Sequence, residues 1–186
     1  MKYIPAFHSY DKMEIKAGKG DFVLYHGNLA IGENNQAALF LVNNVFNDLK
    51  IPFIIAGAKP SRELIKAVKN KNYIELQANI STEKIYELIQ NAQINILPTF
   101  QATGIKLKLL AALFSGRHCI VNTPMVENTG LESLCAITDA SADMKEQIKI
   151  LFEKDFDTNE ISKREKVLYE NFSNKRNIEK LIELIF

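Results

Sequence analysis

The chain lacks an excess of charge of either sign, and this absence argues against a nucleic-acid-binding domain. Its 186 residues include 23 Lys and Arg against 22 Asp and Glu, which gives a net charge of +1 at pH 7. Proteins that bind nucleic acids concentrate positive charge on one face to neutralise phosphates. We therefore predict that neither DNA nor RNA is a partner.

Long apolar runs and a cysteine framework are also missing. No apolar stretch approaches the ~18 residues of a membrane-spanning helix, and the N-terminal region lacks the apolar core of a signal peptide. Cys119 and Cys135 lie in apolar, strand-like segments without Cys-x-x-Cys spacing, which favours small buried side chains over metal ligands or a disulfide. We expect a cytoplasmic protein, and a peripheral position at the inner face of the membrane stays open because a substrate can be membrane-bound.

Sequence signatures of metal sites are absent as well. His8, His26 and His118 stand in separate segments and show neither His-x-x-x-His nor His-x-Glu spacing. We predict no metal site and no cofactor, and we expect the lone histidines to be structural. His26 is the exception whose functional role should be tested, because it ends a predicted strand beside a glycine loop.

Short apolar segments alternate with helical patterns along the chain. The predicted strands are Phe22–His26, Pro52–Gly57, Tyr73–Leu76, Ile94–Pro98, Arg117–Val121 and Cys135–Ile137. Apolar residues at helical spacing follow the first four strands, in residues 33–49, 60–69, 81–92 and 103–115, and recur in the C-terminal part. This alternation predicts an α/β protein: a Rossmann-like, doubly wound parallel sheet of about six strands with flanking helices and a helical C-terminal tail.

The predicted domain occupies residues 21–186. Residues 1–20 mix Pro, Gly, Lys and isolated aromatic side chains without a sustained period, which is typical of an extended linker. In a Rossmann-like sheet the ligand lies beyond the carboxyl ends of the strands, where the strand order reverses. The loops expected there are rich in Gly, Asn, Thr and Lys, and they comprise residues 27–32, 57–59, 77–80, 98–104 and 122–130.

The segment between the fourth and fifth strands carries the strongest chemical signal. An apolar helix is predicted to open at Thr103 and Gly104, with Lys106 and Lys108 in its first turn. A helix N-terminus carries roughly half a positive charge and normally attracts acidic residues. An anion held by the N–H groups of Thr103, Gly104 and Ile105 and by a lysine would remove the conflict, which predicts a phosphate site. Because residues two apart point in different directions around a helix, we expect at most one lysine to point into the site. Two solvated lysines are the alternative.

Three stretches together resemble the C-terminal half of the group 1 glycosyltransferases, which have the GT-B fold. They are YHGNL at residues 25–29, GIKLKLL at residues 104–110, and TGL at residues 129–131, after Gly116 and a strand. The resemblance covers nearly the whole chain, from about Tyr3 to Phe186. It implies two facing Rossmann-like domains, of which the C-terminal one binds a nucleotide-sugar donor and the N-terminal one binds most of the acceptor. This chain would then be half an enzyme, inactive without its facing domain.

The function that this resemblance implies is transfer of a hexose to a glycan or a lipid-linked acceptor, as in polysaccharide biosynthesis. The transfer would be metal-independent and retaining, and the nucleoside diphosphate sugar would be a substrate. The acceptor can be membrane-associated, and no catalytic residue is assigned. Two alternatives stay open. One is a degenerate, non-catalytic GT-B-like domain for ligand binding or interaction, and the other is a different GT-B enzyme, such as a sugar-nucleotide epimerase.

Donor-site residues follow from the resemblance by position. Besides the helix start with Thr103, Gly104, Ile105, Lys106 and Lys108, they are Gly27 and Asn28 after the first strand, Asn79 in the loop that flanks the base, and Glu127, Thr129 and Gly130 beside the phosphates. A simple tight turn is the alternative role for Gly27. A surface position in a loop is the alternative for Glu127.

The chain also departs from the family pattern. Family members commonly carry Arg after the loop glycine and Lys a few residues later, where this chain has Asn28 and the run 33–35, Glu-Asn-Asn. They also commonly have two Glu with seven residues between them, the second binding the ribose hydroxyls, and the matching residues here are Thr103 and Ala111. A charged hydrogen bond of this kind typically contributes ~1.5–3 kcal/mol. We therefore expect weaker donor binding, different contacts, or no donor binding.

Overall fold

The structure, a computed structural model, describes residues 7–10, 12–101 and 106–185. Its centre is a parallel sheet with the strand order β3-β2-β1-β4-β5-β6. The strands are β1 (Val23–His26), β2 (Phe53–Gly57), β3 (Ile74–Ala78), β4 (Ile94–Leu97), β5 (His118–Val121) and β6 (Ala136–Ile137). All six predicted strands are present, with bounds shifted by one or two residues. The predicted fold class is confirmed.

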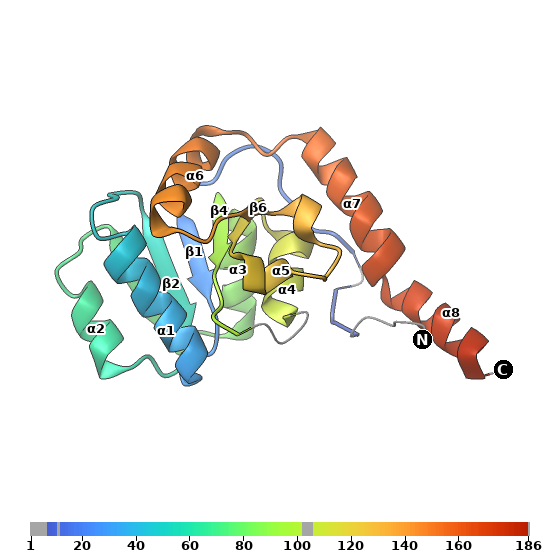
Figure 1. Cartoon of the computed structure of the whole chain (residues 1–186), viewed down its shortest axis with the longest axis horizontal. Coiled ribbons are helices and arrows are strands. Elements are labelled where there is room, and N and C mark those ends of the chain that lie inside the picture. Colours follow the sequence, from blue (N-terminus) through green and yellow to red (C-terminus); the bar gives the residue numbers. More distant parts are fainter. Residues whose placement is uncertain (1–6, 11, 102–105, 186) are drawn as a thin grey trace.

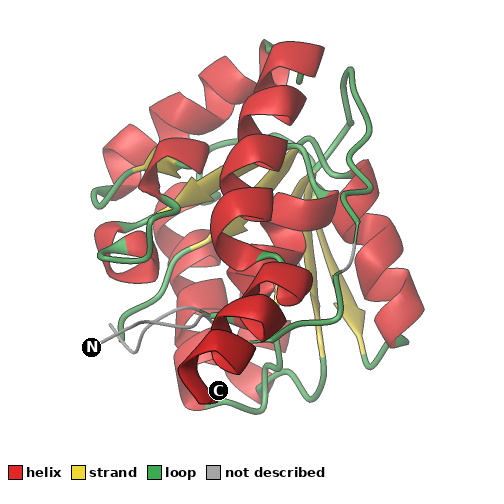
Figure 2. Ribbon diagram, turned by 90° about the vertical axis from the view of Figure 1, so that its right-hand side faces the viewer, coloured by secondary structure: helices red, strands yellow, loops and turns green. Residues whose placement is uncertain are grey.

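Helices cover both faces of this sheet (Figures 1 and 2). One face carries α1 (Gly32–Phe40), the π-helical segment η1 (Leu41–Val45), α2 (Arg62–Val68) and α6 (Ser141–Glu153). The other carries α3 (Thr82–Asn91) and α4 (Leu107–Ser115), which contact each other. The short helices α5 (Thr123–Val126) and η2 (Glu132–Leu134) lie between β5 and β6. The predicted helical tail consists of α7 (Thr158–Phe172) and α8 (Asn174–Ile185), on the side of the molecule away from α2 (Figure 1).

The strands are apolar because they are covered from both sides. In β1, Val23 and Tyr25 belong to the core beneath α1, whereas Leu24 belongs to the core with α3 and Ala111 of α4. All residues of β1, β4 and β5 are buried. This burial explains why these segments show continuous apolar runs instead of alternation.

Two helices differ from the prediction. The helix expected over residues 33–49 is α-helical only to Phe40 and continues as η1. The helix expected to open at Thr103 and Gly104 begins at Leu107, because the preceding Lys106 has an extended backbone (φ −96°, ψ 128°). Apolar spacing shows which face of a helix is buried, but it does not fix the first helical residue. Positions 103–105 themselves lie outside the described residues.

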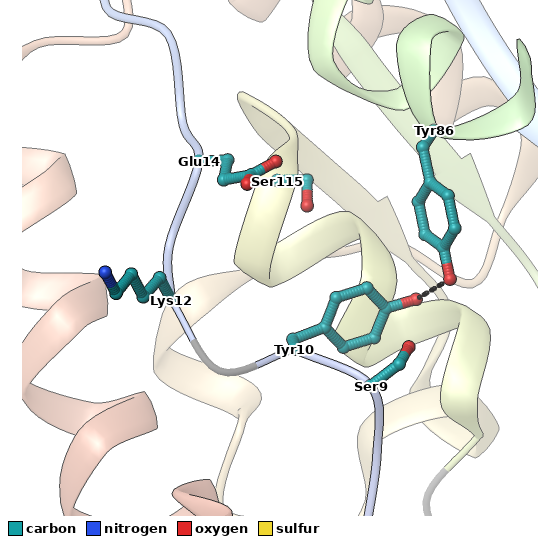
Figure 3. Close-up of a pocket in the computed structure, with 6 residues that line it drawn as sticks. All are labelled: Ser9, Tyr10, Lys12, Glu14, Tyr86 and Ser115. Atoms are coloured by element: carbon teal, nitrogen blue, oxygen red, sulfur yellow. Dashed lines mark hydrogen bonds between the residues drawn. The ribbon is translucent and has the colours of Figure 1, made fainter. Parts of the chain in front are cut away.

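The described part of residues 1–20, the predicted linker, packs against the domain, and we call this segment the lead-in. The Tyr10 ring stacks on Phe114 of α4 with centroids 5.5 Å apart, and its hydroxyl lies 3.0 Å from the Tyr86 hydroxyl of α3 (Figure 3). Two residues earlier in the chain, His8 Nε2 lies 2.7 Å from the carbonyl oxygen of Phe172 at the end of α7. The lead-in therefore connects α3 and α4 with the C-terminal helices.

The hydrogen-bonded ladder between β1 and β4 ends before the strands do. These strands pair at Val23–Ile94 and Leu24–Asn95. By contrast, β1 pairs with β2 as far as His26, and β4 pairs with β5 as far as Leu97. The carboxyl-terminal halves of β1 and β4 therefore pair with different strands, β2 and β5, at the point where the strand order reverses. This is where doubly wound sheets form their ligand-binding crevice.

Candidate functional site

Polar side chains from two helix starts and one loop gather above the crevice between β1 and β4. Glu33 and Asn34 lie in the first turn of α1, and Thr99 lies in the loop after β4. Lys106 immediately precedes α4, and Lys108 is its second residue. We call these five residues the crevice cluster.

Both lysines of the crevice cluster reach the first turn of α1. Lys106 Nζ lies 3.6 Å from Glu33 Oε1, and these two side chains are only 14% and 15% exposed. Lys108 Nζ donates a hydrogen bond to Asn34 Oδ1 (2.9 Å) and lies 5.3 Å from the centroid of the Tyr25 ring. The expectation that at most one lysine points into the site is wrong. It assumed that both residues are helical, whereas Lys106 is extended.

Glu33 places a negative charge inside the crevice cluster. Its Oε1 accepts a hydrogen bond from the Thr99 hydroxyl and also faces the Lys106 ammonium group. From the sequence alone, this stretch was interpreted as the loss of two cations, and Glu33 was not placed in the site. A signal was present, since an acidic residue in the first turn of a helix faces the loops at the carboxyl ends of the strands.

Burial controls the charge of Lys108. Desolvation lowers the pKa of its ammonium group to about 8, with Glu33 raising and Lys106 lowering that pKa as smaller effects. Lys108 is therefore mostly protonated at pH 7 and loses its charge just above neutrality. A bound anion would favour the protonated form.

Asn122 fixes the loop after β4. It is 8% exposed, its Oδ1 accepts from Thr99 N (2.9 Å), and its Nδ2 donates to Thr99 O (2.6 Å). The next residue, Thr123, donates through both N and Oγ1 to the Asp139 carboxylate (2.8 and 2.7 Å). These bonds join the loops after β4, β5 and β6, so that the Thr99 hydroxyl is held toward Glu33. Asn122 was not predicted from the sequence, although a polar residue directly after a buried strand is the available signal.

The loop after β1 contains the predicted residues Gly27 and Asn28. Asn28 Oδ1 accepts from Ala30 N (3.1 Å), so this side chain stabilises the loop itself. A Cβ at Gly27 would lie 3.3 Å from the Asn34 side chain, whereas a Cβ at Gly57 would lie 2.0 Å from the Gly27 carbonyl oxygen. The strict requirement for glycine is therefore at the end of β2, where the β1 loop passes closely over it.

Asn79 lies outside the crevice, after β3 at the edge of the sheet. It adopts φ 56°, its N donates to Gly57 O (3.0 Å), and its Oδ1 accepts from Lys59 N (2.9 Å). Two strand spacings, ~10 Å in all, separate β3 from β1. Asn79 therefore shapes the loop after β2, and among the described residues its hydrogen bonds reach this loop and not the crevice cluster.

The predicted residues after β5 form a separate turn. Glu127 is exposed, and Gly130 has φ 77°, a conformation that favours glycine. Thr129 Oγ1 donates to the carbonyl oxygen of Val126 (2.6 Å), and Thr129 N donates to Glu132 Oε1 (3.2 Å). Thr129 thus stabilises this turn with both its hydroxyl and its amide. The remaining predicted residues, Thr103, Gly104 and Ile105, lie outside the part of the chain that the structure describes.

The described residues include two cysteines, but no group arranged to bind a metal ion and no helix able to cross a membrane. Cys119 is buried and Cys135 is half-buried, and both are free thiols. Within residues 7–10, 12–101 and 106–185, no group of three His, Cys, Asp or Glu side chains is arranged to hold a metal ion. No helix in these ranges is both long and apolar enough to cross a membrane.

Residues 20–154 match the family model described as "Glycosyl transferases group 1". The chain belongs to the group 1 glycosyltransferases. This match covers most of the chain, including all six strands and the crevice cluster. A search of curated protein sequences found no match.

Solved glycosyltransferase structures share the fold of this group 1 domain. A TarM variant from S. aureus, solved with UDP, is 16% identical with a TM-score of 0.68 over 97% of this chain and 38% of its own. A trehalose-phosphate synthase from Burkholderia xenovorans is 11% identical, with a TM-score of 0.65 over 89% of this chain and 43% of its own. AviGT4, a glycosyltransferase of avilamycin A biosynthesis, is 15% identical, with a TM-score of 0.58 over 89% and 51%. The group 1 domain thus spans about half or less of these proteins.

Proposed function

We propose that this group 1 domain is the nucleotide-sugar-binding half of a glycosyltransferase, and that the crevice cluster holds the donor diphosphate. The observation that carries the proposal is the convergence of Lys106 and Lys108 on the first turn of α1. This convergence occurs where the strand order reverses, the usual place for a phosphate ligand in such sheets. The presence of UDP in the TarM complex supports the same class of ligand.

The proposed reaction moves a hexose from the donor to a hydroxyl group of a glycan or a lipid-linked acceptor. The bond from the anomeric carbon to the diphosphate breaks, the acceptor oxygen bonds to that carbon, and the hydroxyl proton leaves. Negative charge then grows on the departing diphosphate. Lys106 and Lys108 would stabilise this charge in a partly buried place, so the proposed transfer needs no metal ion. We propose retention of configuration, a facing N-terminal domain that binds the acceptor, and a cytoplasmic location that allows a membrane-associated acceptor.

A second candidate function is supported by the ion pair of Glu33 with Lys106. This pair neutralises one of the two cations, and Ala111 cannot replace the ribose-binding carboxylate of the family. A domain with these losses could keep the half-fold as a non-catalytic ligand-binding or interaction module. Nucleotide affinity separates the two candidates, because only the first requires it.

Calorimetric titration of the chain with UDP and with GDP tests the proposal. We expect one of them to bind, and we expect Lys106→Ala with Lys108→Ala to weaken that binding by about 100-fold or more. Each lost charged hydrogen bond contributes ~1.5–3 kcal/mol, and 1.4 kcal/mol corresponds to a factor of ten. The matched control is Lys66→Ala with Lys69→Ala, which removes the same charge from exposed positions of α2 and its end. No binding at millimolar nucleotide, or equal loss in both double variants, would refute the diphosphate site.

Raising the pH from 7 to 9 is expected to weaken nucleotide binding by about tenfold. With its pKa at about 8, Lys108 is roughly 90% protonated at pH 7 and roughly 10% at pH 9. The terminal phosphate, with a second pKa of ~6, keeps its charge throughout this range.

The stability of the folded chain should change with pH in the direction opposite to nucleotide affinity. The pKa of Lys108 in the unfolded chain is ~10.4, so the unfolded chain binds more protons between pH 8 and 10.4 and the free energy of unfolding rises there.

Lys108→Arg is the control for this pH dependence, because a guanidinium group stays protonated at pH 9. Calorimetry at both pH values should show a loss of affinity in the wild-type chain and nearly constant affinity in the variant. The same loss in both proteins would mean that another group is responsible.

A further inference from the structure

Cys119 and Cys135 lie side by side on two neighbouring strands, and we call them the thiol pair. β5 and β6 are parallel and pair at Ile120–Ala136 and Val121–Ile137. Each cysteine directly precedes the first residue of this ladder, and Cys135 has an extended backbone (φ −126°, ψ 150°), so the same register places the two opposite each other. Neighbouring strands are ~4.8 Å apart, within the range of about 4.4–6.8 Å for the Cα atoms of disulfide-bonded cysteines.

The two thiols of the pair contact each other. A side-chain hydrogen bond with Cys119, together with burial as a smaller cause, raises the pKa of the Cys135 thiol well above its usual value. Side chains that stand opposite each other on parallel strands project from the same face of the sheet, so this contact agrees with the register. Strand pairing and side-chain contact therefore both place the sulfur atoms next to each other.

A small cavity gives the thiol pair access to solvent. It has a volume of about 210 Å³, and both Cys119 and Cys135 line it. Three other lining residues, Ser133, Lys154 and Lys163, are exposed, so the cavity reaches the surface of the molecule. A water molecule takes up ~30 Å³ in the liquid, and hydrogen peroxide has only one oxygen atom more than water. A peroxide can therefore enter beside the two sulfur atoms.

We propose that Cys119 and Cys135 form an oxidative modification site, at which a peroxide joins the two thiols in a disulfide. In the first step one thiolate attacks a peroxide oxygen, the O–O bond breaks, and a sulfenic acid and one water molecule form. In the second step the other thiol attacks the sulfenic sulfur, the S–O bond breaks, and a second water molecule leaves. The two thiols are oxidised to one disulfide, and one hydrogen peroxide is reduced to two water molecules.

The disulfide would close a ring over residues 119–135, beside the crevice between β1 and β4. This ring contains α5, η2 and Asn122, which holds the loop after β4 through Thr99. It would also tie β6, a strand of two residues at the edge of the sheet, to β5. Oxidation is therefore expected to stabilise this part of the domain. The inference does not depend on the proposed nucleotide site, because it concerns the thiols alone.

Peptide mass mapping tests whether a peroxide joins the thiol pair. The folded chain is treated with a small excess of hydrogen peroxide, remaining thiols are alkylated, and the chain is digested without reduction. We expect most chains to be monomers that carry a Cys119–Cys135 cross-link and have lost two hydrogen atoms. Alkylation of both cysteines, sulfinic acid without a cross-link, or disulfides between chains only would overturn the inference.

An unfolded chain can also close this ring, so a second measurement tests whether the fold favours it. The equilibrium with reduced and oxidised glutathione is measured for the folded chain and for the chain unfolded in urea. We expect the equilibrium constant for disulfide formation to be at least about tenfold larger in the folded chain. The oxidised chain should then melt about 3–6 °C above the reduced chain, since tenfold is ~1.4 kcal/mol and each kcal/mol shifts Tm by ~2–4 °C at this size. An equal or smaller constant in the folded chain, or an unchanged Tm, would overturn the inference.

Cys135→Ala is the matched control, because the four methionines of the chain can also react with peroxide. This variant keeps the methionines but cannot form the cross-link, so its Tm should not rise after peroxide treatment. A rise equal to that of the wild-type chain would contradict the proposal. Dithiothreitol provides the same control without a variant, since it should return the Tm of the oxidised wild-type chain to its starting value. A Tm that stays raised after reduction would assign the change to another modification.

Discussion

Glu33→Gln is expected to tighten the binding of UDP or GDP by about 10- to 100-fold. The Glu33 carboxylate lies 3.6 Å from Lys106 Nζ and competes with a phosphate for this cation. Glutamine has nearly the same size, and its amide oxygen can still accept the hydrogen bond from the Thr99 hydroxyl. The substitution thus removes one negative charge from a partly buried site. A charged contact of ~1.5–3 kcal/mol becomes available to the ligand.

Glu83→Gln is the matched control, because Glu83 also lies in the first turn of a helix but is exposed at the start of α3. Its nucleotide affinity should equal that of the wild-type chain. Calorimetry with UDP, GDP and pyrophosphate distinguishes a phosphate effect from an effect on the rest of the nucleotide. Unchanged or weaker binding by Glu33→Gln would contradict the competition model and would indicate that Glu33 itself contacts the ligand.

The outcome also bears on the choice between an active and a non-catalytic domain. If the wild-type chain binds nucleotide, Glu33 only moderates the charge of the site. If Glu33→Gln alone binds nucleotide, the ion pair with Lys106 has closed an ancestral phosphate site. The second result would support the ligand-binding or interaction module as the present function of this group 1 domain.

Arg164→Met is expected to lower the free energy of unfolding by about 3–5 kcal/mol, because at least two hydrogen bonds from a charged donor, each worth ~1.5–3 kcal/mol, are lost. Arg164 of α7 is 3% exposed and donates to the carbonyl oxygens of Gly116 (2.6 Å) and Arg117 (2.7 Å). A weaker third bond joins it to Leu113 O (3.4 Å). These oxygens belong to the C-terminal end of α4 and the residues after it, and the last turn of α4 contains no basic residue of its own. Methionine would fill much of the space but leave the carbonyl groups unpaired.

Urea denaturation measures this loss, with Lys166→Met on an exposed position of α7 as the control. The control should change the free energy of unfolding by less than ~0.5 kcal/mol. A loss below about 1 kcal/mol for Arg164→Met would show that water replaces Arg164 at these carbonyl groups. The measurement therefore tests whether α7 stabilises the helix that carries Lys108 at its other end.

The order and approximate bounds of the strands could be predicted from local sequence. Parallel strands covered on both faces are short apolar runs, and the intervening helices repeat apolar residues at helical spacing. The same pattern located the loops at the carboxyl ends of the strands, because that location follows from the topology of the fold. The start of α4 was predicted too early, since periodicity does not determine whether Lys106 is helical or extended.

The residues that make up the candidate site were harder to predict from the sequence than the strands were. Lys106 and Lys108 were predicted from their place in the first turn of an expected apolar helix, and their neighbours Glu33 and Asn34 are more than 70 residues away in the chain. Asn122 was missed because its role, two hydrogen bonds to the backbone of Thr99, exists only when the loops after β4 and β5 meet.

The sequence by itself determined the alternation of strands and helices, the family resemblance and the position of the two lysines, because each depends on residues close together in the chain. Only the tertiary structure decided that Glu33 neutralises Lys106, that both lysines point the same way, and that His26 lacks a protein partner among the described residues. The reason is that charge balance, burial and hydrogen bonding depend on which distant segments meet across the crevice between β1 and β4. Local patterns of polarity place these loops at one edge of the sheet, but they do not determine which side chains pair there.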